Sequence, residues 1–287
     1  MGAGSAISAL LAPATRLAWL GGLIHGNGVM FSSVHGLASK VRHGIVLTRV
    51  LLLAVSEVNV DHQKQVFLDL EGDRYFQRNK EALDGGRGGQ DLALYEKYME
   101  RGSRVLEIGC ANGSNLEYFV RSRGIAASGI DPSELAIQQG RTRAPYLDLC
   151  VGTADALPYP DAHFDFVLFG FCLYLVDRPL LSKVVSEADR VLRDSGFMGI
   201  TDFDVSTPLR RPYQHFKGIH SYKYDYSRLF LAFPHFSLVE KLAFSHAAAR
   251  FTPEVQERLS AVLLFKDHAH AYVSIEQDIL QNAHVGG

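Results

Sequence analysis

The sequence predicts an α/β fold built around a mostly parallel sheet, and two observations carry this prediction. Residues 104–108 (RVLEI) read as a buried strand that is followed by a turn of small residues and by a helix starting near Ser114. About 20 residues after that turn, a second short strand over residues 127–131 ends in Asp131. A β-α-β unit with an acid at this point can accept hydrogen bonds from both hydroxyls of a ribose. The pattern therefore indicates a site for a nucleotide-sized cofactor.

The turn after the first strand has the composition of a ligand cradle. Its small side chains let the backbone come close to a ligand, and glycine tolerates a positive φ. The dinucleotide fingerprint requires glycine at its first, third and sixth positions, but these are Gly109, Ala111 and Ser114 here, so only the first is met. Glu107 adds a negative charge at the end of the strand. An acidic strand end favours a ligand with a cationic amino-acid moiety over a dinucleotide.

Residues 107–113 (EIGCANG) resemble the first motif of the class I S-adenosylmethionine-dependent methyltransferases. Asp131 matches the ribose-binding acid of that family, and residues 152–159 resemble its third motif, in which Asp155 contacts the adenine amino group. Residues 164–169 resemble its fourth strand, and residues 188–200 its next helix and fifth strand. Four motifs in the family's order make a chance resemblance improbable.

The resemblance covers roughly residues 60–267 and departs from the commonest first motif only at Ala111, where Gly is frequent. It implies a Rossmann-like sheet of seven mostly parallel strands, with helices on both faces and an antiparallel last strand. Residues 236–245 are expected to form the sixth strand, and residues 257–266 a seventh that pairs antiparallel with it.

The resemblance also implies which residues hold S-adenosylmethionine. Residues Phe169 and Gly170, at the end of the fourth strand, are expected near the methyl-bearing end of the cofactor. The remaining cofactor contacts are expected from Glu107, Gly109, Cys110, Ala111, Gly113, Asp131, Ala154, Asp155 and Ala156.

The segment before the first strand resembles the N-terminal cap of small-molecule methyltransferases. Residues 66–83 have helical character after Gly72, and Tyr75, Phe76 and Asn79 share one helix face, where they could bind the acceptor. The alternative is an aromatic face that only packs on the sheet. A helix over residues 90–101 is expected to lead into the first strand.

The acceptor side of the site is expected from two later segments. Tyr174 follows the fourth strand, where family members place acceptor-facing residues. Residues 202–228 form an insertion that we expect to set specificity, and within it His220, Tyr222 and Tyr224 alternate as on a strand. Since histidine titrates near neutrality, His220 is a candidate general base for a hydroxyl acceptor. A solvated surface loop is the alternative for this insertion.

The chain divides into three expected parts. Residues 1–59 contain no Asp or Glu before Glu57 and are expected to be a poorly ordered extension, with a membrane span and an organelle transit peptide as the alternatives. The methyltransferase domain is expected over residues 60–267, with a cap at 60–101, a core at 102–267 and the insertion described above. Residues 268–287 are expected to be a tail.

Composition narrows the choice of partners. Twenty-nine Lys and Arg against 31 Asp and Glu give a net charge of −2, which supplies no broad basic face for nucleic acid. The three cysteines are far apart, so neither a zinc knuckle nor a disulfide framework is indicated. His268 and His270 lack a third ligand with zinc spacing, and no metal is expected. We expect a cytoplasmic protein without stable membrane insertion, with homodimerisation as an open possibility.

The function that the motifs predict is methyl transfer from S-adenosylmethionine to a small molecule. A sugar or another precursor of a surface polysaccharide is the suggested acceptor. Two alternatives stay open. The first is a catalytically silent subunit that keeps the cofactor fold and serves as a partner or scaffold. The second is an NAD-dependent dehydrogenase, against which the missing glycines and Glu107 speak.

Overall fold

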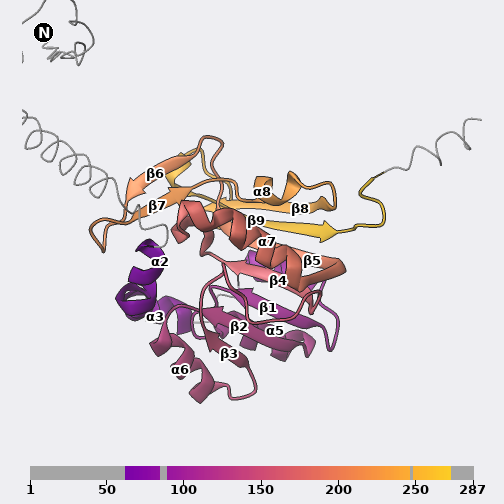
Figure 1. The fold of residues 1–287 in the computed structure, drawn as a ribbon, viewed down its shortest axis with the longest axis horizontal. Helices are drawn as coiled ribbons and strands as arrows, with labels where there is room; N and C mark the ends of the chain where they lie inside the picture. Colours follow the sequence, from indigo (N-terminus) through magenta and orange to yellow (C-terminus); the bar gives the residue numbers. More distant parts are fainter. Residues whose placement is uncertain (1–61, 85–88, 246–247, 273–287) are drawn as a thin grey trace, which may run out of the picture. The chain divides into compact units, whose positions relative to one another are not determined.

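The computed structural model describes residues 62–84, 89–245 and 248–272 of the 287-residue chain (Figure 1). The extension expected over residues 1–59 lies outside the described residues, as does the expected tail from residue 273 onward. Among the helices that are described, none is both long enough and apolar enough to cross a membrane.

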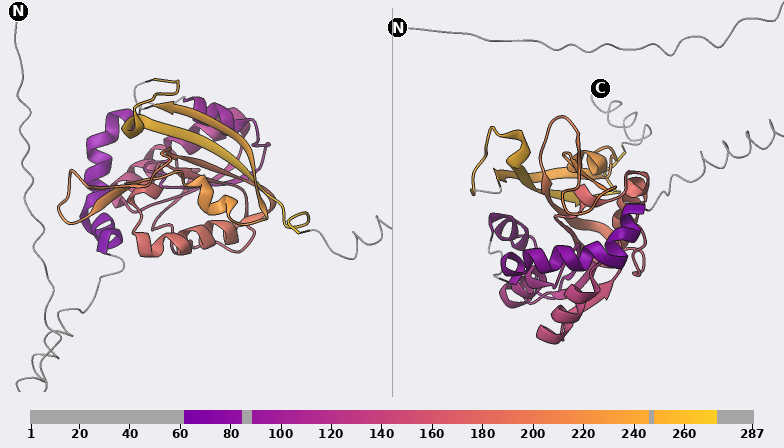
Figure 2. Two further views of the ribbon diagram at one scale, coloured as in Figure 1. Left: turned by 90° about the horizontal axis from the view of Figure 1, so that it is seen from above. Right: turned by 90° about the vertical axis from the view of Figure 1, so that its left-hand side faces the viewer.

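The centre of the fold is a seven-stranded sheet in the order β3-β2-β1-β4-β5-β9-β8. Strands β1 to β5 pair in parallel, whereas β9 runs antiparallel to both of its neighbours, β5 and β8. Figure 2 shows β8 and β9 running side by side in orange and yellow. The predicted fold class is confirmed, including the antiparallel last strand. The strands are β1 (Arg104–Ile108), β2 (Ala126–Asp131), β3 (Asp148–Val151), β4 (Phe164–Gly170), β5 (Leu192–Phe203), β8 (Phe236–Ser245) and β9 (Arg258–Lys266).

Helices cover both faces of this sheet. On one face, buried side chains such as Tyr95, Phe119 and Ile137 form one apolar core, and on the other face Val184 and Phe230 belong to a second. The helices of the first face are α4 (Gln90–Glu96), α5 (Ser114–Arg123) and α6 (Glu134–Arg143), and those of the second are α7 (Leu181–Val191) and α8 (Ser227–Leu231) (Figure 1).

The two cores explain why the central strands are apolar at almost every position. In β1, Val105 faces the core under α4 and α5, while the next residue, Leu106, faces the core under α7. Successive side chains of a strand point to opposite faces, so a parallel strand covered on both sides reads as a continuous apolar run. This is the pattern by which residues 104–108 are recognised in the sequence.

Helix α4 ends earlier than expected. The sequence predicts a helix over residues 90–101, but α4 ends at Glu96. The amides of Tyr98 and Met99 bond to the carbonyls three residues before them, which tightens the chain into turns ahead of Gly102, whose φ is +82°. The helix pattern alone did not indicate this stop.

A helical segment that we call the cap helix precedes the sheet. It consists of α2 (His62–Val66), the π-helical turn η1 (Phe67–Glu71) and α3 (Gly72–Asp84), so it begins well before Gly72, where helical character was expected. The Gln63 side chain donates to the carbonyl of Leu175 and, at 2.9 Å, to that of His220. The cap helix thus touches two segments that follow it by more than a hundred residues.

The two segments that the cap helix contacts are a hairpin and a 3₁₀-helix. His220 lies in a hairpin of β6 (Leu209–Pro212) and β7 (His220–Lys223), which occupies the middle of the insertion expected at residues 202–228. Leu175 ends the 3₁₀-helix η2 (Leu173–Leu175), which follows β4 and comes before η3 (Arg178–Leu180). A last 3₁₀-helix, η4 (Val255–Glu257), leads into β9.

Tyr95→Phe should lower the free energy of unfolding by about 1–2 kcal/mol, because the Tyr95 ring is fully buried and its hydroxyl lies 3.0 Å from the Thr201 hydroxyl between α4 and β5. Urea unfolding measures this loss. Tyr146→Phe, at a side chain that is 57% exposed, is the matched control and should change stability by less than about 0.5 kcal/mol. Equal effects of the two substitutions would contradict the role of the buried hydroxyl pair.

Candidate functional site

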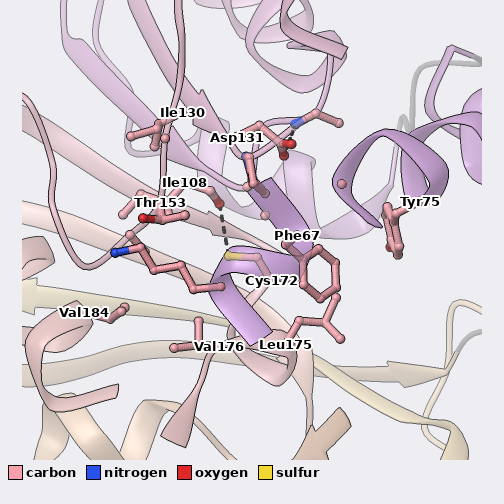
Figure 3. Close-up of a pocket in the computed structure, with 18 of the residues that line it drawn as sticks. Phe67, Tyr75, Ile108, Ile130, Asp131, Thr153, Cys172, Leu175, Val176 and Val184 are labelled. Carbon is pink, nitrogen blue, oxygen red and sulfur yellow. Dashed lines mark hydrogen bonds between the residues drawn. The ribbon is translucent and has the colours of Figure 1, made fainter. Parts of the chain in front are cut away.

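A cavity opens at the carboxyl ends of β1, β2 and β4 (Figure 3). In the strand order, β1 and β4 are the neighbours from which the chain winds in opposite directions, and open α/β sheets bind ligands at such a point. The cavity has a volume of about 1040 Å³, including its part open to solvent. Strand ends line one side of it, and Phe67 and Tyr75 of the cap helix line another.

The turn after β1 is shaped by backbone that only small residues tolerate. Gly109 has a φ of +77°, and a side chain there would also place its Cβ 2.7 Å from the Cβ of Cys172. Ala111 has a φ of +47°, which is strained for a residue with a Cβ. In this conformation the Ala111 amide donates to Oδ2 of Asp131 at 2.9 Å. The turn is therefore fastened to the end of β2.

Asp131 is the acid on which the turn depends. Its Oδ1 accepts a second backbone amide, that of Ser133, at 2.8 Å. Burial raises the pKa of Asp131 to about 6, although the two amide donors act in the opposite direction. The carboxylate also lines the cavity, where its remaining lone pairs can accept hydrogen bonds from a ligand.

Glu107 lies on the other side of the same turn. Its side chain is buried and lines a second, smaller cavity of about 520 Å³, and its Oε1 accepts from Nδ2 of Asn115 at 2.7 Å. A Cβ on Gly170 would lie 2.6 Å from that oxygen, so the glycine at the end of β4 makes room for the carboxylate. This end of the site carries negative charge suited to a cationic group.

Asp155 forms the third acidic position. It is buried and accepts from Nζ of Lys64 at 2.9 Å and from the Thr153 hydroxyl at 2.7 Å. Burial alone would raise the pKa of Asp155, but these hydrogen bonds together with the positive charge of Lys64 outweigh burial and lower it. Lys64 belongs to the cap helix, and no feature of the sequence linked it to a residue 91 positions later.

The expected site residues fall into three groups, which line the main cavity, the second cavity or neither. Eight line the main cavity, and Glu107 and Cys110 line the second one, so most of the expected cofactor contacts are brought together. The eight are Tyr75, Phe76, Gly109, Ala111, Asp131, Ala154, Asp155 and Gly170. The described linings of both cavities do not include Asn79, Gly113, Ala156, Phe169, Tyr174, His220, Tyr222 or Tyr224.

His220 has a partner in its own hairpin, and its expected role as a base stays a prediction. Its Nε2 lies 2.9 Å from the guanidinium of Arg210, and because a guanidinium only donates, this nitrogen accepts and is occupied. The guanidinium of Arg178 lies over the ring of Tyr222, 4.3 Å from its centroid. Tyr224 lies beyond the end of β7, so the three side chains do not alternate along one strand as expected.

Asn79 and Tyr174 also have structural partners. The Asn79 amide donates at 2.8 Å to the carbonyl of Tyr75, one turn earlier in the same helix. The Tyr174 ring is buried against Phe171, with 4.9 Å between ring centroids. Burial, followed by the charge interaction and the hydrogen bond with Tyr75, raises the pKa of Tyr174 well above its usual value. Tyr174 is thus linked to Tyr75, which lines the cavity.

His268 has neighbours that the sequence did not indicate. Its ring stacks on that of His235 at 4.2 Å, and Asp189 completes a group whose possible ligand atoms lie within 4.8 Å of one another. However, the buried ammonium of Lys266 lies 2.8 Å from Asp189 Oδ1 and already neutralises this carboxylate. His270 pairs with Asp267 instead. The expectation that the chain holds no metal stays a prediction.

Residues 105–196 match the family model of a methyltransferase domain. The chain is similar to phthiotriol/phenolphthiotriol dimycocerosates methyltransferase 1 of Mycobacterium ulcerans, with 34% identity over 38% of this chain and 40% of that protein. It is similar to the demethylmenaquinone methyltransferase of Renibacterium salmoninarum, with 32% identity over 39% of this chain and 47% of that one. The fatty-acid O-methyltransferase of Mycolicibacterium smegmatis is 36% identical over 35% of this chain and 37% of its own length. The chain therefore spans less than half of the length of these relatives.

Solved structures share the fold at low identity. A chain of the complex between the Trm112 methyltransferase activator and a putative methyltransferase of Haloferax volcanii has a TM-score of 0.53 and 20% identity, covering 69% of this chain and 96% of that one. The 1,6-didemethyltoxoflavin-N1-methyltransferase of Burkholderia thailandensis has a TM-score of 0.51 and 17% identity, covering 84% of this chain and 93% of that one. The likeness concerns the arrangement of sheet and helices.

Ala111→Gly should raise the melting temperature by roughly 2–4 °C, because it removes about 1 kcal/mol of strain from a residue in the left-handed region. Thermal unfolding followed by circular dichroism measures the shift. Ala136→Gly is the control, because Ala136 is buried inside α6 and its substitution should destabilise by about 1 kcal/mol or more. A lower melting temperature for Ala111→Gly would show that the turn is not strained.

Proposed function

Because the chain carries a class I S-adenosylmethionine-dependent methyltransferase domain, we propose that it binds S-adenosylmethionine over β1 and β4 and transfers the methyl group to a small-molecule acceptor. The observation that carries the proposal is the pairing of the Ala111 amide with the Asp131 carboxylate. It sets Asp131, the acid that we propose binds the ribose, beside the glycine-containing turn after β1, and both line one cavity. Since the chain spans less than half of its relatives, their whole activity is not carried over by similarity alone.

The residues present fit the three parts of this cofactor. The Asp131 carboxylate can accept from the two ribose hydroxyls, and the buried carboxylate of Glu107 offers negative charge for the amino group. Asp155 can accept from the adenine amino group beside its contact with Lys64. Gly109 leaves room on the turn that a Cβ would fill.

The mechanism requires mainly positioning. When bound, S-adenosylmethionine supplies a methyl group that its sulfonium already activates for direct displacement. The chain has to hold an acceptor atom in line with that methyl and keep water away. Phe67 and Tyr75 of the cap helix, with Leu175 after β4, line the part of the cavity that can enclose the acceptor. Cys172 needs no nucleophilic role, and burial raises the pKa of its thiol well above the usual value.

Of the two expected catalytic residues, Tyr174 keeps a role in this proposal and His220 does not. Tyr174 holds the Tyr75 hydroxyl at the cavity and is a positioning residue in this account. We assign no proton transfer to His220, because its Nε2 already accepts from the Arg210 guanidinium. The proton of a hydroxyl acceptor can leave to water.

The comparisons and the sequence constrain the identity of the acceptor less than that of the cofactor. The relatives are named for dimycocerosates, demethylmenaquinone and fatty acids, whereas the sequence suggested a sugar or a polysaccharide precursor. Neither suggestion rests on a contact in this chain. The proposed function therefore assigns the acceptor only as a small molecule.

Full-length protein titrated by calorimetry should bind S-adenosylmethionine and its demethylated product, S-adenosylhomocysteine. Asp131→Asn should weaken both by about tenfold to a hundredfold, because a hydrogen bond to a charged group contributes about 1.5–3 kcal/mol. Asp161→Asn, at a carboxylate that is 79% exposed, is the control and should bind as the parent does. Binding of NAD in place of both ligands would favour the dehydrogenase, and no binding of any of the three would favour the scaffold.

Cofactor affinity should fall at acidic pH. The ribose hydroxyls need the charged carboxylate of Asp131, and the pKa of that group in the free protein is about 6. Lowering the pH through 6 therefore protonates the acceptor of these hydrogen bonds. Between pH 7.5 and pH 5.5 the affinity for S-adenosylhomocysteine should decrease about fourfold. A parent protein whose affinity is as insensitive to pH as that of Asp131→Asn would contradict this assignment.

A further inference from the structure

The two ends of the main cavity differ in chemistry. The charged and hydroxyl-bearing residues, among them Asp131, Thr153 and Asp155, lie along the strand ends that the cofactor is proposed to occupy. Between the cap helix and the segment after β4, the lining is mostly apolar or aromatic, and Lys64, Cys172 and Asp177 are its polar members (Figure 3). We call this part the acceptor end and define it by Phe67, Tyr75, Phe76, Phe171 and Leu175.

The charged groups near the acceptor end are already paired. Lys64 Nζ bonds to Asp155 at 2.9 Å, and Asp177 accepts the backbone amide of Lys64 at 2.7 Å. The thiol of Cys172 donates to the carbonyl of Ile108 at 3.3 Å, and burial keeps it protonated by raising its pKa. These groups hold the cap helix and the strand ends together and are engaged within the protein.

The backbone at the acceptor end is strained at one aromatic residue. Phe171 has a φ of +60°, which is unusual for a bulky residue, and its ring packs on Tyr174 at 4.9 Å and on Phe203 at 5.2 Å. Strained residues of this kind cluster where a site needs a side chain in a set position. The strain presents an aromatic ring to the cavity directly after β4.

One polar group interrupts the apolar wall. The Tyr75 hydroxyl is hydrogen-bonded to that of Tyr174, and a phenol can both donate and accept. A ligand hydroxyl can therefore share this pair. A ligand with many hydroxyls would bury most of them against Phe67, Phe76, Phe171 and Leu175 without partners, which is unfavourable.

We propose that the acceptor is an apolar molecule, an alkyl chain or an aromatic ring system, that carries a single hydroxyl and lies between the cap helix and Phe171. This inference rests on the proposed function. The acceptor oxygen forms the new O–C bond as the S–C bond breaks, both electrons of that bond stay on sulfur, and the hydroxyl proton passes to water. A sugar, the acceptor suggested by the sequence, does not match this end of the cavity.

The test is calorimetric titration of the full-length protein, saturated with S-adenosylhomocysteine, with three probes: 1-octanol, 2-naphthol and methyl α-D-glucopyranoside. At least one of the two alcohols should bind ten times more tightly than the glucoside. Tighter binding of 1-octanol indicates an alkyl acceptor, and tighter binding of 2-naphthol indicates an aromatic one. A glucoside that binds as tightly as both alcohols, or alcohols that do not bind, overturns the proposal.

Two variants locate the binding. Leu175→Asp places a charge in the wall and should weaken the better alcohol at least tenfold, whereas Leu231→Asp, on the exposed side of α8, should change it less than twofold. Phe67→Ala adds no charge. If Leu175→Asp does not fold, Phe67→Ala must show the weaker binding of the alcohol instead. Equal affinities of the wall variants and Leu231→Asp overturn the proposal.

The same titration separates this proposal from the one on which it rests. Binding of S-adenosylhomocysteine with no preference for an alcohol removes the apolar acceptor and leaves the proposed function standing. No binding of S-adenosylhomocysteine by the folded parent removes the proposed function, and the assigned acceptor with it.

Discussion

The site depends on one hydrogen bond, from the Ala111 amide to the Asp131 carboxylate. It links the turn after β1 to the end of β2, and Ala111 makes it while its backbone is at a positive φ. Asp131 is thereby held in the cavity wall, and its pKa is about 6. A small decrease in pH below neutrality therefore begins to remove its charge. The strain in the turn and the burial of this acid are both costs to stability, as is common where a fold is shaped for a ligand.

The same cavity separates charge from apolar surface. Its acidic residues lie along the strand ends, and the ion pair between Lys64 and Asp155 joins them to the cap helix. The cap helix also brings Phe67 and Tyr75 opposite the segment after β4. A charged cofactor and an apolar acceptor can therefore meet in one enclosed space, each against a wall of matching chemistry. The cap helix covers one side of the reacting atoms, and the part of the cavity that is open to solvent lets water take the proton of the acceptor.

Short sequence patterns predicted those parts of the structure that depend on interactions between residues close together in the chain. The apolar run at residues 104–108, the small residues of the turn and the acid at position 131 lie within one β-α-β unit, and their arrangement follows from strand and turn preferences. The contacts of Lys64 and Gln63 with residues more than 90 positions away leave no such pattern. His220 was expected at the site because alternation predicts a shared face, yet its hairpin turns it toward Arg210. Phe171 lies in the segment after the fourth strand that was expected to face the acceptor, but Tyr174 was chosen there because backbone strain at Phe171 has no signature in composition.

A crystal structure of the full-length protein with S-adenosylhomocysteine tests the central claim most directly. The account predicts both ribose hydroxyls within hydrogen-bonding distance of the Asp131 carboxylate, with the Ala111 amide still donating to it. It also predicts that the sulfur faces the space between Phe171 and the cap helix. Density for the ligand away from the ends of β1 and β4, or a ribose that does not contact Asp131, would contradict it.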